Sequence, residues 1–167
     1  GWPAGKDMND GGGGVIFHLW KDNAGVEHGL IVALTDQSIS QAWSNVTSAE
    51  IGTLAQSSWD GFSNSNSIVG QAGHTSSAAK LCLDLVSGGQ SDWYLPSIQE
   101  LNMLWNNYYT VTRALSQISG ATQLFNGAYW SSSEHAINYA WNFGFNNGYT
   151  NINGKNNTSC VRAVRAF

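Results

Sequence analysis

The chain has 167 residues, a formal net charge of −4, and 42% hydrophobic, 12% aromatic but only 11% charged residues. This length and aromatic content indicate one domain, 1–167, with a packed core, and they exclude a disordered chain. The acidic balance leaves no basic patch to neutralise phosphates, so nucleic acid is not expected as a partner.

The first part of the chain predicts a loop and a hairpin. The four glycines at 11–14 are expected to form a loop, because neither a Gly-Lys-Ser/Thr motif nor a glycine fingerprint that opens a helix follows them. The apolar runs 15–20 and 29–34 predict two strands joined by a polar turn. The Ser-, Asn- and Thr-rich stretch 44–67 is expected to be a long ordered excursion, with a short helix near 48–55.

Residues 76–87 place apolar side chains at helical spacing, with Ser76 or Ser77 as the cap and two glycines at the end. Cys82 lies on the apolar side of this helix and is expected to be buried. The other cysteine, Cys160, is too distant in sequence to form a close-spaced metal-binding pair with Cys82. The sequence does not decide whether the two cysteines form a disulfide.

A second helix is predicted from 98 to 105. Ser97 and Glu100 stand three residues apart, which is the spacing of a capping box, and an apolar stripe follows. A shorter helix is predicted through 112–118. Strands then follow helices without strict alternation, which indicates the α+β class.

Near the C-terminus the hydrophobic period changes to two. Aromatic residues at 141, 143 and 145 alternate with Asn142, Gly144 and Asn146. Because successive side chains of a strand point to opposite faces, the rings, together with Trp130, are expected to lie in the core and the amides in solvent. Asn-Gly pairs at 147–148 and 153–154 predict turns, and 161–167 predicts a closing strand.

Several segments occur in an order that resembles a known family: GGGGVIFHLW, HGLIVALTDQS, KLCLDLVSGGQSDWYLPSIQEL, YWSSSE and VRAVRAF. Together they resemble the bacterial C-type-lectin-like family that includes the Lcl C-terminal domains. Trp93–Ser97 resembles its W-R-L-P-T signature, with Tyr94 in place of the usual Arg. The resemblance implies an α+β, C-type-lectin-like fold with two or three helices around short antiparallel sheets.

The region from about 129 to 167 resembles, more narrowly, the variable region of diversity-generating retroelement target proteins. In those systems Asn codons of the AAC type are randomised to NNC, which cannot encode Trp, Lys, Glu, Gln or Met. Between 135 and 160 only Trp141 and Lys155 belong to that excluded set. The resemblance implies a ligand-binding display protein whose exposed residues are diversified to recognise varying targets.

The residues that this resemblance assigns to ligand binding are His135, Ala136, Ile137, Tyr139, Asn142, Gly144, Tyr149, Asn151, Asn153, Ser159 and Cys160. Tyr139 and Tyr149 are the strongest affinity candidates, since tyrosine combines rigid contact area with a hydrogen-bonding tip. For Tyr149 and Ile137, packing on a neighbouring strand or loop is the alternative. The expected partner is a variable protein or glycan ligand on another cell surface.

The same resemblance implies an extracellular or cell-surface location, or a phage particle. No apolar run in the sequence is long enough to cross a membrane, so direct membrane insertion is not expected in this segment. An anchoring segment is expected to lie outside this chain. The alternative function is a fixed-specificity bacterial adhesin or carbohydrate-binding domain of the same fold.

An enzyme is not expected. The four histidines lie far apart, and the two cysteines do not match the paired active-site cysteines of formylglycine-generating enzymes, which share the broad fold. Glu134 is the one acid after Gly127, too few for a calcium-dependent lectin site, so neither a metal at the binding surface nor a cofactor is expected. Arg162 and Arg165 are expected to pair with acids such as Glu134 or Asp92.

Overall fold

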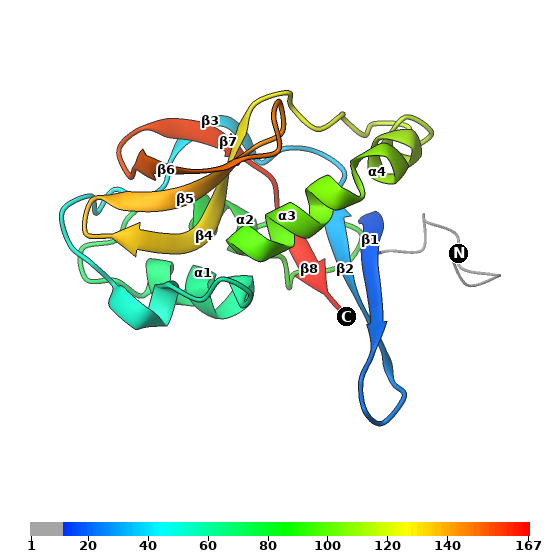
Figure 1. Ribbon diagram of the computed structural model, residues 1–167, viewed down its shortest axis with the longest axis horizontal. Helices are drawn as coiled ribbons and strands as arrows, with labels where there is room; N and C mark the ends of the chain where they lie inside the picture. Colours follow the sequence, from blue (N-terminus) through cyan, green and yellow to red (C-terminus); the bar gives the residue numbers. More distant parts are fainter. Residues whose placement is uncertain (1–11) are drawn as a thin grey trace.

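The computed structural model describes residues 12–167. The first eleven residues of the predicted domain 1–167, including Gly11 of the glycine loop, lie outside the described residues. The chain forms two sheets with helices packed between and around them (Figure 1). Its elements are β1 (Gly14–Lys21), β2 (Glu27–Ala33), β3 (Ser38–Ala42), η1 (Gly52–Ala55), α1 (Gly61–Val69), α2 (Ala78–Leu83), α3 (Ile98–Asn106), α4 (Tyr108–Leu115), β4 (Ala128–Ala136), β5 (Tyr139–Gly144), β6 (Thr150–Gly154), β7 (Thr158–Val161) and β8 (Val164–Ala166).

The smaller sheet has the strand order β1-β2-β8. The predicted early hairpin is confirmed: β1 and β2 pair antiparallel, with Val15 opposite Val32. The predicted closing strand 161–167 is instead divided. Its first residue ends β7 in the larger sheet, whereas Val164 pairs with Val32 in the smaller one. The C-terminal segment therefore connects the two sheets.

The larger sheet has the strand order β3-β7-β4-β5-β6. Strands β4, β5 and β6 follow one another as antiparallel neighbours, and β4 meets β7 in parallel at Tyr129 and Cys160. At the middle of this sheet, on β4, helices cover both faces. Tyr129 joins the core cluster beneath α3 and α4, whereas the next residue, Trp130, joins the cluster beneath α1 and α2.

The helix predictions succeed where a cap marks the helix start. Glu100 N donates to Ser97 Oγ at 3.2 Å, and Ser97 N donates to Glu100 Oε2 at 2.8 Å, which is the predicted capping box. Ser77 caps α2 with its side chain alone, since Ser77 Oγ accepts from Lys80 N at 3.0 Å. The described residues contain four α-helices rather than two or three, because α1 lies within the stretch predicted as an excursion. Its Ser- and Asn-rich sequence has low helix propensity, and Asp60 caps it.

A buried ion pair holds the far end of the larger sheet. Lys155 Nζ donates to Glu134 Oε1 at 2.6 Å, and neither side chain is exposed to solvent. The same ammonium donates to the carbonyls of Ala49 and Ile137 at 3.1 and 2.9 Å. Glu134 also accepts hydrogen bonds from the backbone N–H groups of residues 51 and 52. Because these groups come from three separate segments, the pair fixes their relative positions.

Arg162 forms a second buried centre between the two sheets. Its guanidinium donates to the carbonyls of Ala33, Leu34 and Thr122 at 2.8, 2.7 and 2.8 Å. It also pairs with Asp36 at 3.1 Å. Arg162 therefore pairs with an acid, as expected, but the acid is Asp36 and not Glu134 or Asp92.

Arg165 pairs with Asp92 at 2.6 Å, so the expected pairing of this arginine is confirmed.

Both cysteines are free and buried. Burial of Cys82 on α2 is as predicted, and it raises the pKa of that thiol far above its ordinary value. Burial also raises the pKa of Cys160 to about 11. Neither thiol is therefore activated for chemistry at neutral pH. Among residues 12–167, no helix has the length and apolar character needed to span a bilayer.

Candidate functional site

The structure divides the eleven predicted ligand-binding residues into two groups. Those that reach solvent are His135, Ile137, Tyr139, Tyr149 and Asn151, with Ala136 and Asn153 partly exposed. Those that do not are Asn142, Gly144, Ser159 and Cys160. Asn142 is only 4% exposed, Ser159 6% and Cys160 2%. These four are a correction to the sequence prediction, because a ligand at the surface cannot contact them in this conformation.

The physical reason is that β5 and β7 are interior strands of a sheet covered on both faces. Phe143 pairs with Tyr129 on the side of α3, and Asn142 pairs with Trp130 on the opposite side, where α1 and α2 pack. Alternation along β5 therefore separates two cores instead of separating core from solvent. Burial of Phe143 and Phe145 is confirmed, but exposure of the interleaved Asn142 is wrong.

Trp141 is a second correction. It was expected in the core, but it is only partly buried, and its ring packs edge-on against His135 with centroids 4.9 Å apart. It pairs with Ile152 on β6, and both side chains lie on the side of the sheet that α3 covers farther along, at Phe143. Trp141 is partly exposed and Ile152 is 47% exposed, so this part of the sheet face presents apolar side chains to solvent.

Exposed rings and apolar side chains follow the β5–β6 hairpin along its length. Tyr139 begins β5, Trp141 pairs with Ile152 in the middle, and Tyr149 precedes β6 at the other end. We define the aromatic face as His135, Tyr139, Trp141, Tyr149 and Ile152. Tyr139, Tyr149 and Ile152 are 48%, 67% and 47% exposed. Large apolar side chains gathered at the surface of a soluble domain mark interaction sites more often than isolated ones do.

A groove of about 550 Å³ lies between the aromatic face and α3. Its lining residues are Ile98, Gln99, Asn102, Phe143, Gly148, Tyr149, Thr150 and Asn151. None of these side chains is charged, so the groove offers amide and hydroxyl groups beside apolar ones. The turn that carries Tyr149 rests on α3, since a Cβ at Gly148 would come within 2.7 Å of the Trp105 ring.

The chemistry available at this surface is that of contact and hydrogen bonding. Within the part of the chain that the structure describes, no group of three His, Cys, Asp or Glu side chains is placed to hold a metal ion. Glu134, the acid nearest to His135 in sequence, is held inside by Lys155. The aromatic face therefore has the groups of a binding surface, with tyrosine hydroxyls and amides supplying direction.

Comparison with known proteins adds the family. The Lcl C-terminal domain family matches residues 20–165, which include the larger sheet, the groove and the aromatic face. The chain belongs to the Lcl C-terminal domain family. This Lcl C-terminal domain also resembles, in structure, a fimbrial protein from Bacteroides ovatus ATCC 8483, with a TM-score of 0.64 and 17% sequence identity. The likeness covers 86% of the Lcl C-terminal domain and 36% of the fimbrial protein, and shows a shared fold. No match was found among curated proteins.

Sequence reasoning missed two features of this Lcl C-terminal domain. The exposure of Trp141 and Ile152 depends on which elements pack over that face of the sheet, which no local pattern encodes. A second hollow, on the other side of α3, was missed because its rim residues Trp59 and Phe62 lie in the polar stretch read as an excursion. Two large aromatic residues in a Ser- and Asn-rich stretch were the signal that could have indicated it.

Proposed function

We propose that this domain is a non-catalytic, C-type-lectin-like binding module of a cell-surface or virion protein, and that its ligand contacts the aromatic face and the adjoining groove. The observation that carries the proposal is the exposure of Tyr139, Tyr149 and Ile152 beside a groove of about 550 Å³. Exposed rings next to a concave surface with amide groups favour recognition of a protein or glycan on another surface. Membership of the Lcl C-terminal domain family and the fold shared with a fimbrial protein support an adhesin-type role.

The finer form of the proposal is that a retroelement diversifies the exposed positions. Two observations support tolerance of such change. Five of the proposed positions are exposed, and substitutions at exposed positions usually shift stability by about 0.5 kcal/mol or less. They are His135, Ile137, Tyr139, Tyr149 and Asn151. Lys155, one of the two residues in the window that Asn codons cannot reach, is a buried partner of Glu134. Lys155 therefore supports the fold, and the exposed changeable positions are the ones proposed to meet the ligand.

Sequences of sibling loci separate the diversified form from a fixed-specificity adhesin. The diversified form predicts differences concentrated at the exposed positions of 135–160, with Glu134 and Lys155 constant. It also predicts a reverse-transcriptase gene and a near-copy of the region nearby. Differences spread evenly along the chain would instead favour the fixed adhesin, which leaves the binding face in place.

Removal of two tyrosine side chains tests the face itself. The purified domain is screened on a glycan array and on intact cells of a bacterial panel. For whichever surface binds, Tyr139→Ala combined with Tyr149→Ala is expected to weaken binding at least about tenfold, because exposed aromatic anchors dominate such interfaces. The melting temperature is expected to stay nearly unchanged.

Tyr109→Ala serves as the matched control, since Tyr109 is 77% exposed on α4, away from the aromatic face. It should bind as the unmodified domain does. Equal loss of binding in the control, or full binding by the double variant, would contradict the assignment of the ligand to this face.

A further inference from the structure

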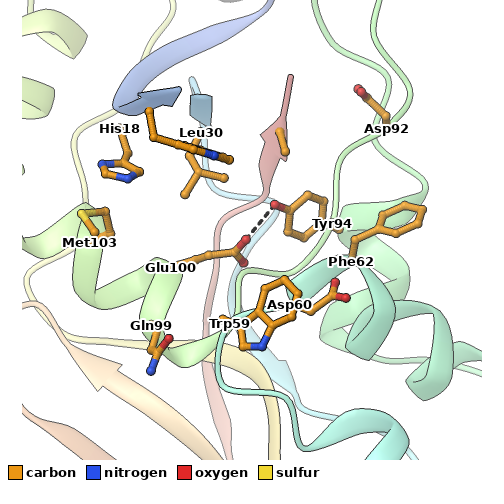
Figure 2. A pocket seen from close by; sticks show the side chains of 12 residues that line it. His18, Leu30, Trp59, Asp60, Phe62, Asp92, Tyr94, Gln99, Glu100 and Met103 are labelled. Atoms are coloured by element: carbon orange, nitrogen blue, oxygen red, sulfur yellow. Dashed lines mark hydrogen bonds between the residues drawn. The ribbon is translucent and has the colours of Figure 1, made fainter. Parts of the chain in front are cut away.

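A cavity of about 580 Å³ lies on the opposite side of α3 from the aromatic face (Figure 2). Its wall combines the smaller sheet, through His18 and Leu30, with the turn before α1, through Trp59 and Asp60. Gln99 is the residue that it shares with the groove. The cavity is therefore a separate site, with its own chemistry, and the proposed ligand contacts do not use it.

The wall of this cavity is aromatic, and much of it remains exposed. Trp20, Trp59 and Phe62 are 41%, 70% and 50% exposed at the rim. The Trp20 ring is held in place, since it stacks on His18 with centroids 5.5 Å apart. Phe62 meets the Tyr94 ring edge-on at 5.9 Å. Because these rings stay exposed, their apolar surface contributes little hydrophobic free energy to folding. A ligand seated among them would cover that surface.

The charges that face the cavity are acidic. Within residues 12–167, the two carboxylates nearest its centre in Figure 2, Asp60 and Glu100, accept hydrogen bonds from neutral groups. Glu100 accepts from the Tyr94 hydroxyl and from Ser97 N, each at 2.8 Å, and Asp60 accepts from Ser63 N and Oγ. These bonds orient the carboxylates without cancelling their charge.

A third acid at the wall, Asp92, is neutralised. Arg165 donates to both of its carboxylate oxygens, at 2.6 and 2.9 Å. Of the residues that the structure describes, no lysine or arginine lines the cavity. This part of the chain therefore combines aromatic faces with two carboxylates that no described cation neutralises.

This combination selects one ligand chemistry. An anion is repelled, and a neutral apolar molecule leaves the carboxylates desolvated beside it. A cation gains from both features, since ring faces attract an ammonium group and carboxylates pair with it. We propose that this cavity binds a small organic cation, an ammonium group on an apolar or aromatic body, seated between Trp20, Trp59 and Phe62 with its charge toward Asp60 and Glu100.

The test compares two probes with the same phenylethyl body, 2-phenylethylammonium with a cationic head group and 2-phenylethanol with a neutral hydroxyl. Binding is followed by NMR through the indole N–H signals of Trp20 and Trp59 in isotope-labelled protein at pH 8. The ammonium probe is expected to bind at least about tenfold more tightly than the alcohol and to shift both indole signals. Equal affinity for the two probes, or shifts confined to Tyr149 and Asn151, would overturn the proposal.

Two isosteric variants locate the charge. Glu100→Gln and Asp60→Asn are each expected to reduce the preference for the ammonium probe to about threefold or less, with the affinity for the alcohol unchanged. Both retain capping, because Gln suits the third helical position and Asn suits the N-cap. Glu50→Gln removes the same charge from an exposed residue outside the cavity wall and should leave the preference unchanged. An equal effect in this control would mean that overall net charge, not the cavity, sets the preference.

The preference should also rise with pH. Burial raises the pKa of Glu100 to about 7, so this carboxyl gains its charge between pH 6 and 8. The other titratable or charged groups around it are Tyr94, Asp60, Asp92, Arg165 and His18. A preference that grows from pH 6 to 8 in the unmodified domain and in His18→Gln, but stays constant in Glu100→Gln, supports the assignment. A constant preference in the unmodified domain contradicts it.

The cavity and the aromatic face are tested independently. Combined replacement of Tyr139 and Tyr149 by alanine should leave ammonium binding unchanged, since neither residue lines the cavity. Loss of ammonium binding in that double variant would place the probe on the aromatic face and refute the cavity proposal. The proposed adhesin-type function would stand in either case.

Discussion

Lys155→Met is expected to lower the free energy of unfolding by about 3–5 kcal/mol. The substitution leaves the Glu134 carboxylate buried without its cation, and neither side chain of the pair has any solvent exposure to relieve that charge. It also removes the donor to the Ala49 and Ile137 carbonyls. Chemical denaturation of the purified variant measures the change.

Two further variants separate the buried charge from the lost methylene packing. Adding Glu134→Gln to Lys155→Met removes the orphaned charge, and the double variant is expected to recover part of the loss. Lys80→Met breaks the exposed pair with Asp84 and should cost about 0.5 kcal/mol or less. If Lys155→Met were no more destabilising than Lys80→Met, the ion pair would not hold the sheet end in place.

Arg162→Lys is expected to destabilise the domain by about 2–4 kcal/mol although the charge is conserved. The guanidinium spreads its donors over three carbonyls and Asp36, which come from two separate segments, 33–36 and residue 122. A lysine ammonium is a point donor and cannot reach all of them. At least one buried carbonyl is then left without a partner. Thermal and denaturant unfolding of the variant report the loss.

Arg165→Lys is the matched control, because Arg165 pairs with Asp92, whose side chain is 50% exposed. Its cost should be about 1 kcal/mol or less. Equal destabilisation by the two substitutions would show that the planar fork of Arg162 contributes nothing beyond its charge.

The sequence predicted correctly the helices and the hairpin that are determined by interactions between residues close together in the chain. The capping box at Ser97 and Glu100, the β1–β2 hairpin and the helix capped by Ser77 depend on neighbours within a few residues, and all are present. Helix α1 has an N-cap in Asp60 but a body of poor helix formers, so packing rather than propensity holds it, and sequence reasoning missed it.

The candidate site could be predicted only in part. Exposure of Tyr139 and Tyr149 was correct because both lie next to turns, where the chain reaches the surface. Burial of Asn142 and partial exposure of Trp141 depend on which elements cover each face of β5, and that is decided by segments far away in sequence. A period of two fixes which side chains share a face, but it does not say which face meets water.

The order of strands in the smaller sheet has a mechanical consequence. Because β2 is antiparallel to both β1 and β8, the outer two run in the same direction, so the chain enters at one end of this sheet and leaves at the other. Tension between those ends shears the backbone hydrogen bonds, including the pair that joins Gly29 and Phe167 at 3.0 and 3.1 Å, and does not open them singly. The larger sheet lies outside the line that joins these two ends, so tension between them would load the smaller sheet first.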